Sequence, residues 1–200
     1  MSYLFCDSRY NAQGNKFFSV FNVHNNIKKL NLSTWNTSNV TDMSGMFSDC
    51  KTLVELDLSS FDTSNVDNME WMFSECKSLE QLDISRFDTS EVKDMGGMFS
   101  ECKLLTELDL SNFNTSNVNN MTWMFSECYK LKKLDLSSFD TSNVKRMRNM
   151  FDQCHSLETV DFSNFTFEDL RDTITPNDFL MCNQSLINKF MEVYNKWCEK

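Results

Sequence analysis

The sequence repeats itself every 26 residues. Successive copies of one segment begin at Leu53, Leu79, Leu105 and Leu131. A weaker copy begins at Ile27 and the pattern fades after Leu157, which makes five full units and a sixth partial one. Self-similarity at a short fixed period is typical of a solenoid, in which each unit packs only against its neighbours. Function is therefore expected on an extended surface and not in an enclosed pocket.

The first part of each unit, L-x-x-L-D-L-S, predicts a short strand. Apolar residues such as Leu56 and Leu58 alternate with polar ones, which is the period of a strand with one buried face. Glu55, Asp57 and Ser59 would then point outward. Strands of neighbouring units are expected to pair in parallel, about 4.8 Å apart.

The second part, V-x-x-M-x-x-M-F-x-x-C, predicts a helical or 3₁₀ arc, because its apolar residues recur mostly at intervals of three. In one unit these residues are Val66, Met69, Met72, Phe73 and Cys76. A polar corner, F-D-T-S-N, joins the two parts, and its side chains can hydrogen-bond the local backbone. The candidates for a cap or an amide ladder at this corner are Asn39, Asn65, Asn117 and Asn143.

The complete string L-D-L-S-S-F-D-T-S-N-V-x-x-M-x-x-M-F-x-x-C resembles the repeat of BspA-like leucine-rich-repeat surface proteins, a repeat also found in mycoplasma lipoproteins. The similarity covers residues 27–166. It implies an α/β solenoid, a right-handed array of about five to six units with short parallel strands. It also implies a role in adhesion or protein binding. The signal peptide, lipobox and wall anchor of the family are not visible in this sequence.

Segments that break the repeat flank it on both sides. Residues 1–26 are expected to form an N-terminal cap, because Phe17, Phe18 and Phe21 can cover the open edge of the first unit. Residues 167–200 are expected to form a C-terminal helical cap, since apolar residues after Pro176 recur at helical spacing. An exposed helix for docking or dimerisation is the alternative for this segment. The predicted solenoid itself spans residues 27–166.

Charge and hydropathy narrow the classes of partner. The formal net charge of −10 argues against nucleic acid, whose phosphates need a Lys/Arg surface, and against an anionic membrane face. No apolar run reaches the ~20 residues of a membrane span. The N-terminus lacks the basic and apolar regions of a secretory signal. The protein is thus expected to stay inside the cell. The alternative is that the chain begins after a removed leader, since the resembled family is largely found at the cell surface.

Five cysteines stand in register at the end of the apolar arc series: Cys50, Cys76, Cys102, Cys128 and Cys154. A small buried hydrophobe fits this place, so buried free thiols are predicted. Disulfides or a metal are the alternatives. The sequence contains no C-x-x-C pair, and its histidines, His24 and His155, stand alone. No metal site or cofactor is therefore predicted.

Five aspartates also stand in register: Asp57, Asp83, Asp109, Asp135 and Asp161. Stacked carboxylates repel one another, and something must offset that repulsion. Hydrogen bonds from Ser59, Ser85, Ser111 and Ser137 are the preferred explanation, and bound cations such as Ca²⁺ are the alternative. Repeated, equivalent carboxylates do not form the special pair that acid–base catalysis needs, and no nucleophile or phosphate motif is present. The chain is predicted not to be an enzyme.

Positions that differ between units are the best candidates for recognition, because stacking explains the positions that are identical. On the outer strand face these candidates are Glu55, Gln81, Glu107 and Lys133. Between the two arc methionines, Trp71 and Trp123 are two units apart with Gly97 between them. If exposed, the two rings would flank a backbone groove about 10 Å wide. The alternative is that each ring packs over small residues of adjacent units.

Charge is graded along the array. Basic residues gather in the fifth unit, at Lys130, Lys132, Lys133, Lys145, Arg146 and Arg148. Acidic residues gather near the second and third units, at Glu55, Asp67, Glu70, Glu75 and Glu80. This polarity can orient a protein partner or stack copies head to tail, random surface variation is the alternative, and the oligomeric state stays open. The leading hypothesis is a non-enzymatic protein-binding module. A purely structural module of a larger assembly and a cation-binding module are the alternatives.

Overall fold

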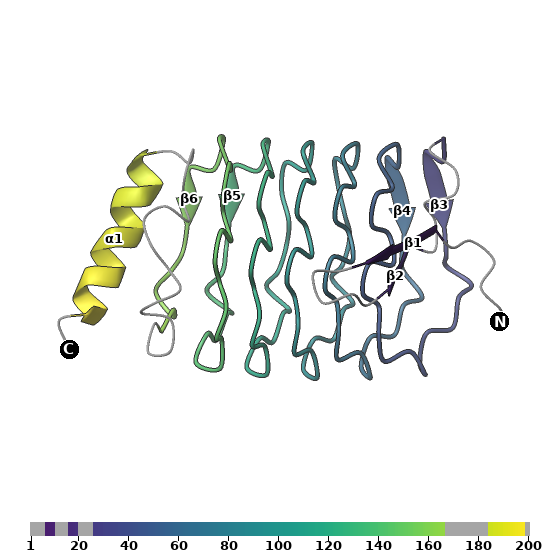
Figure 1. Ribbon diagram of the computed structural model, residues 1–200, viewed down its shortest axis with the longest axis horizontal. Helices are drawn as coiled ribbons and strands as arrows, with labels where there is room; N and C mark the ends of the chain where they lie inside the picture. The colour runs from purple at the N-terminus through teal and green to yellow at the C-terminus, as the bar shows by residue number, and fades with distance from the viewer. Residues whose placement is uncertain (1–6, 11–15, 20–25, 167–183, 199–200) are drawn as a thin grey trace.

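The computed structural model describes residues 7–10, 16–19, 26–166 and 184–198 of the 200-residue chain. Strand β1 (Asp7–Tyr10) pairs antiparallel with β2 (Lys16–Ser19). A column of stacked turns follows, and helix α1 (Gln184–Cys198) lies at its far end (Figure 1). Each turn of the column is called a rung here. Rungs 1 to 5 contain Met43, Met69, Met95, Met121 and Met147, respectively.

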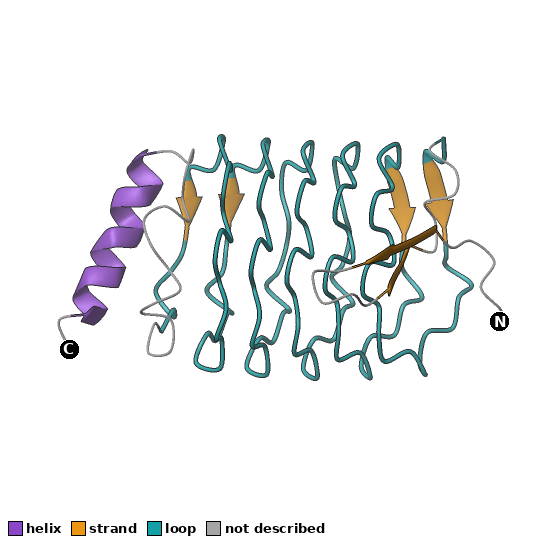
Figure 2. Ribbon diagram, in the orientation of Figure 1, coloured by secondary structure: helices purple, strands orange, loops and turns teal. Residues whose placement is uncertain are grey.

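Short parallel strands run along one side of the column. Strand β3 (Lys29–Asn31) pairs with β4 (Glu55–Asp57), and β5 (Lys133–Leu134) pairs with β6 (Thr159–Val160). Rungs 3 and 4 lie between these pairs and follow the same path as loops (Figure 2). The predicted solenoid of stacked repeats with parallel strands is therefore confirmed, although its named strands are few and only two or three residues long.

The predicted helical or 3₁₀ arcs are wrong for the described residues, which form turns in this part of each rung. Along the arc, backbone N–H groups donate alternately to the next rung and to their own rung. The Gly45 N–H donates to the Glu70 carbonyl of the next rung at 2.8 Å, whereas the Met46 N–H donates to Met43 of its own rung at 3.2 Å. Phe47 again donates to the next rung. A 3₁₀ helix would keep every bond within one rung, so the spacing of three reflects successive turns.

Two positions in each arc have a left-handed backbone, as a type II turn requires of its third residue. The first set comprises Gly45, Trp71, Gly97, Trp123 and Asn149, with φ between 57° and 62°. The second set comprises Asp49, Glu75, Glu101, Glu127 and Gln153, with φ between 59° and 67°. Most of these residues are not glycine, so the repeated bonds between rungs must outweigh a backbone cost of about 1 kcal/mol at each position.

The core is a stack of identical side chains along the axis of the column. One arc phenylalanine per rung contributes to it: Phe47, Phe73, Phe99, Phe125 and Phe151. Neighbouring rings lie 5.5–5.7 Å apart between centroids and are tilted by only 5–10°. Burying each ring contributes up to about 3 kcal/mol. Stacking of this kind requires the same residue in every rung, which explains why these positions do not vary.

Buried threonines join the polar corners of successive rungs. The Thr63 hydroxyl donates to the Asp88 carbonyl at 2.8 Å and accepts from the Asp88 N–H at 2.8 Å. The same pair of bonds recurs at Thr37, Thr89, Thr115 and Thr141. Asn65, Asn117 and Asn143 each donate from the side-chain amide to a serine carbonyl of the preceding rung. The corner side chains therefore bond between rungs as well as locally.

The in-register cysteines are free thiols, as predicted, and all are buried except Cys50, which is half-buried. The Cys76 Sγ–H donates to the Phe47 carbonyl of the preceding rung at 3.3 Å, and Cys102, Cys128 and Cys154 repeat this bond. Burial raises the pKa of Cys76, Cys102 and Cys128 well above that of an exposed thiol. Burial, with a smaller effect of Asp49, raises the pKa of Cys50 to about 12. These thiols pack as small hydrophobic groups.

Helix α1 packs against the last rung through its apolar face. Leu186 and Phe190 are buried, and the Phe190 ring meets the edge of Phe162 at 5.4 Å. Ile187, Met191, Val193 and Tyr194 are partly buried against the same core. Most of residues 1–26 and residues 167–183 lie outside the described part, so the predicted caps are described only through the β1–β2 pair and α1.

Candidate functional site

Three of the four candidates on the outer strand face lie together. Gln81, Glu107 and Lys133, from rungs 3, 4 and 5, line one open depression of about 510 Å³. Asp83, Asp109 and Asp135 line the same depression. Glu55 lies outside it, where its carboxylate pairs with Lys29 at 2.6 Å.

The depression lies where the strands are least regular. It extends from rung 3 to Lys133 of β5, and rungs 3 and 4 contain no strand. The Thr106 N–H donates to the Glu80 carbonyl at 3.4 Å, a long bond compared with the usual 2.9 Å. The backbone of rungs 3 and 4 is therefore held mainly by the arcs and corners, and the strand face opens there.

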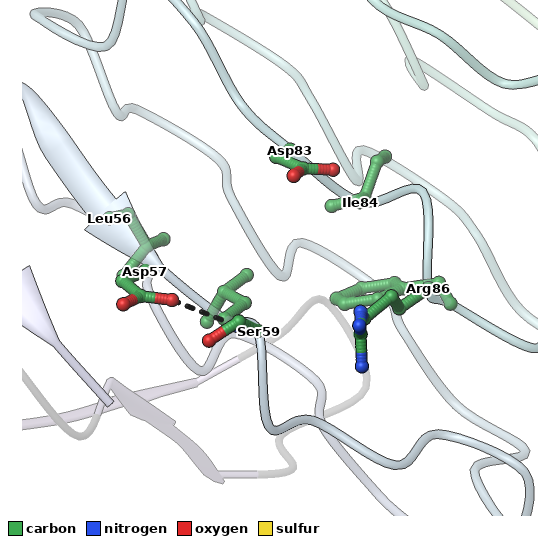
Figure 3. Close-up of a pocket in the computed structure, with 8 residues that line it drawn as sticks. Leu56, Asp57, Ser59, Asp83, Ile84 and Arg86 are labelled. Atoms are coloured by element: carbon green, nitrogen blue, oxygen red, sulfur yellow. Dashed lines mark hydrogen bonds between the residues drawn. The ribbon is translucent and has the colours of Figure 1, made fainter. Parts of the chain in front are cut away.

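A second hollow lies between rungs 2 and 3. Asp57 and Ser59 border it on one rung, and Asp83, Ile84 and Arg86 border it on the next (Figure 3). Its volume of about 70 Å³ has room for water and not for a ligand, since small-molecule sites occupy roughly 300–1,000 Å³. The larger depression is the better candidate for recognition.

Serine hydrogen bonds hold the stacked aspartates, which was the preferred explanation from the sequence. Oδ1 of Asp57 accepts the Ser59 N–H at 3.0 Å, and the equivalent bonds join Asp83, Asp109, Asp135 and Asp161 to the serine two residues later. The serine bonds lower the pKa of all five carboxyls and outweigh the repulsion between neighbours. Among the described residues, no group of three His, Cys, Asp or Glu side chains is arranged to hold a metal ion.

The tryptophans do not flank a groove. Trp71 lies directly over Gly97, because a Cβ built on Gly97 would be 2.0 Å from Cε3 of Trp71. The Trp71 and Trp123 rings are 5.7 Å apart between centroids and are tilted by 40°. Of the two alternatives drawn from the sequence, the structure therefore shows packing over a small residue of the next rung for Trp71, and not the groove. The left-handed backbone at Trp71 lets its ring lean along the column over the next rung. Trp123 keeps 41% of its surface exposed.

A row of ion pairs on the arcs was not predicted. Lys51 joins Asp49 to Glu75, at 2.7 and 3.5 Å, and Lys77 joins Glu75 to Glu101, at 3.3 and 2.9 Å. Lys103 continues the row to Glu127 at 3.0 Å. Hydrogen bonds to the acids, Asp49 for Lys51 and Glu101 for Lys77, raise the pKa of these lysines. The available sequence signal was the acid–Cys–Lys triplet that recurs around the in-register cysteines.

The row ends in aromatic residues. Tyr129 replaces the lysine in rung 4, and its hydroxyl donates to Glu127. The Lys103 ammonium lies 4.7 Å from the centre of the Tyr129 ring. The His155 ring also stacks on Tyr129, with 5.1 Å between the ring centroids. His155 is thus part of the surface stacking, and His24 lies outside the described residues.

None of the described helices is long and apolar enough to cross a membrane.

Comparison with known proteins agrees with this architecture. A family model described as "Mycoplasma protein of unknown function, DUF285" matches residues 15–109 and again residues 83–184. No curated protein matches the sequence. A leucine-rich repeat protein from Treponema pallidum is 15% identical, with 94% of this chain and 93% of that chain covered and a TM-score of 0.51.

Two further solved structures are similar. A leucine-rich repeat protein from Bacteroides ovatus is 18% identical, with 76% of this chain covered and a TM-score of 0.43. This chain spans only 43% of that protein. A leucine-rich cell surface protein from Faecalibacterium prausnitzii is 16% identical, with 60% and 51% of the two chains covered and a TM-score of 0.24.

The Treponema protein, at 15% identity, shows a shared leucine-rich-repeat fold and confirms the resemblance seen in the repeat string. The family matches overlap and together run from residue 15 to residue 184, across the whole column of rungs. The chain belongs to the DUF285 family of mycoplasma-type repeat proteins and has the fold of bacterial leucine-rich-repeat proteins.

Proposed function

We propose that the chain is a non-enzymatic protein-binding module whose strand face carries recognition. One observation carries the proposal: Gln81, Glu107 and Lys133 differ from rung to rung yet line the same open depression. Stacking does not constrain these exposed side chains. They give the three rungs different side chains within one depression.

The shape and charge of the depression favour a polypeptide segment. It is open, whereas sites for small molecules are concave clefts that enclose most of the ligand. Its carboxylates, at Asp83, Asp109 and Asp135, stay ionised because serine bonds lower their pKa. Exposed charge pairs of this kind add little affinity, about 0–1 kcal/mol each, but they set specificity and speed association. A segment with basic side chains along the three rungs and an acidic one near Lys133 would match.

Site-specific crosslinking tests the proposal. A photoreactive phenylalanine analogue at position 81 is expected to crosslink a discrete protein partner in cells, and Glu107→Lys is expected to weaken that crosslink. The control is the same analogue at Glu91, an exposed acidic residue of rung 3 on the corner of the column. Equal crosslinking from both positions would exclude the strand face as the recognition surface.

Adhesion is the more specific form of this function that the BspA-like resemblance suggests. Adhesion is tested by measuring how much purified protein binds to candidate cell surfaces. The amount bound by the Glu107→Lys variant is compared with that bound by Glu91→Lys. A purely structural module would show neither discrete crosslinks nor a difference between these variants. No described contact favours the cation-binding alternative.

A further inference from the structure

We propose that a second copy of this chain docks, antiparallel, on the face formed by the first half of each arc. This arc face consists of positions 41, 42, 44 and 45 of rung 1 and of their equivalents in rungs 2 to 5, most of which are exposed or half-buried. Backbone bonds between rungs hold these segments in register, as from Asp67 to Thr41 and from Gly45 to Glu70. It is a different stretch of each repeat from the strand face.

The arc face is acidic at one end and basic at the other. Asp42, Asp67 and Glu70 lie in rungs 1 and 2. Lys145, Arg146 and Arg148 lie in rung 5 and are exposed. Rung 3 carries one charge of each sign, and the equivalent residues of rung 4 are Asn119, Asn120 and Thr122. Three negative charges at one end are therefore matched by three positive charges at the other.

Ion pairs within the chain neutralise only part of this polarity. Lys93 pairs with Asp67 at 3.1 Å, and Arg146 reaches back to Asp94 at 3.8 Å. Asp42 and Glu70 at one end, and Lys145 and Arg148 at the other, make no ion pair with any described residue. Glu70 is half-buried and hydrogen-bonded to the Trp71 side chain, whereas Asp42, Lys145 and Arg148 are exposed and available to charges outside the chain.

The aromatic pair lies between the charged ends. Trp71 covers Gly97 in rung 3 and contacts Trp123 in rung 4, and Trp123 is 41% exposed. Exposed tryptophan at the centre of a surface with a charged rim is the usual composition of an interface hot spot. The indole surface supplies apolar area, and the flanking charges supply orientation.

Symmetry selects the antiparallel arrangement. In a two-fold dimer, each contact occurs twice with the partners exchanged. If the axis passes near rung 3, the acidic end of each copy faces the basic end of the other, and the two aromatic pairs meet at the centre. A parallel arrangement would place like charges together, which is unfavourable at each pair.

The size of the face predicts a weak dimer. Five rungs at about 4.8 Å each give a length of roughly 24 Å. A face this short buries less than the 1,200–2,000 Å² of a standard stable interface. The dimer is therefore expected to form reversibly and to appear only at high concentration.

Sedimentation equilibrium of the full chain over a wide concentration range tests the proposal. The wild type is expected to show a monomer–dimer equilibrium. Reversal of the basic end, by Lys145→Glu with Arg148→Glu, is expected to weaken dimerisation about tenfold or more, because both copies then repel. Lys130→Glu with Lys132→Glu is the matched control, since both lysines are exposed and lie off the arc face.

A charge-swap experiment makes the test specific. Asp42→Lys with Glu70→Lys reverses the acidic end, and this variant alone is also expected to stay monomeric. Mixed with the base-reversed variant, it is expected to form a heterodimer, because every facing pair then has opposite signs. Thermal unfolding of each variant verifies that it is folded. A wild type that stays monomeric throughout, or folded variants that fail to pair when mixed, would overturn the proposal.

Discussion

The ring of Trp71 occupies the space into which a side chain at Gly97 would project. An ideal Cβ at Gly97 would lie 2.0 Å from Cε3 of Trp71, and the backbone at Gly97 has a φ of 62°. The two residues lie at equivalent positions of neighbouring rungs, so the Trp71 ring leaves no room for a side chain at position 97. This contact explains why glycine follows Trp71, whereas Trp123, which is 41% exposed, is followed by Asn149.

Gly97→Ala is expected to destabilise the protein by about 2–4 kcal/mol, since the new methyl group meets the Trp71 ring and alanine disfavours a left-handed backbone. Urea unfolding measures the change. The control places the same substitution in a Trp71→Gly background, where only the backbone cost of about 1 kcal/mol should remain. An equal loss in both backgrounds would show that the ring does not restrict this position.

Lys77→Ala is expected to cost only about 0.5–1 kcal/mol, although Lys77 lies near two carboxylates, because its side chain is 32% exposed and solvent screens the pairs. The loss should shrink in 1 M salt, where the screening length is about 3 Å. Lys130→Ala is the comparison, because Lys130 is exposed and has no ion pair with any described residue. A loss that does not change with salt would indicate packing by the lysine stem instead.

The stacked aspartates predict a loss of stability in acid. Serine bonds lower the pKa of Asp57, Asp83 and Asp109 in the folded state. Their stabilisation is therefore complete above the unfolded pKa of about 3.9 and is lost as the pH falls through the folded values. Urea midpoints between pH 5 and pH 2 measure this loss.

Asp83→Asn supplies the matched control for the acid series. In rung 1 the same place is taken by Asn31, whose side-chain oxygen accepts the Ser33 N–H at 2.9 Å. The variant should keep the turn and show a shallower decline in acid. An unchanged decline would mean that Asp83 does not contribute to the acid sensitivity.

The buried thiols predict slow labelling and a loss of stability in alkali. Burial raises the pKa of Cys76, Cys102 and Cys128 in the folded state. Their contribution is present below the unfolded pKa of about 8.5 and is lost as the pH rises above it. A chain in which Cys6, Cys182, Cys198 and the half-buried Cys50 are serine should react with a thiol reagent at pH 8 only at its unfolding rate. Rapid labelling under native conditions would contradict the buried positions.

Several features could be inferred from the repeat because stacking constrains them in every unit. Leu58, Phe73 and Cys76 recur at the same place, and the structure buries all three. The hydrogen bonds between the aspartates and their serines could also be predicted, because an Asx turn needs only an Asp side chain and the N–H two residues later. The strand-face candidates Gln81, Glu107 and Lys133 were found from the differences between units.

Other features depend on neighbours in the next rung. Three-residue spacing resembles a helix, but the arc backbone donates alternately within and between rungs, and a one-dimensional pattern does not distinguish the two. The lysine row was not predicted because its pairs join residues 24 positions apart, or two positions apart across a cysteine. The direction of the Trp71 ring depends on a left-handed backbone angle that the residue type itself does not favour.

The sequence alone determined that the chain is a stack of equivalent units, which face of each strand is buried, and which positions are free to vary. Periodicity carries this information because identical rungs must bury identical side chains. The tertiary structure decided how the arcs are hydrogen-bonded, that Trp71 closes over Gly97, and that three variable strand-face residues share one depression. These features arise between rungs, where backbone angle and side-chain direction set the contacts.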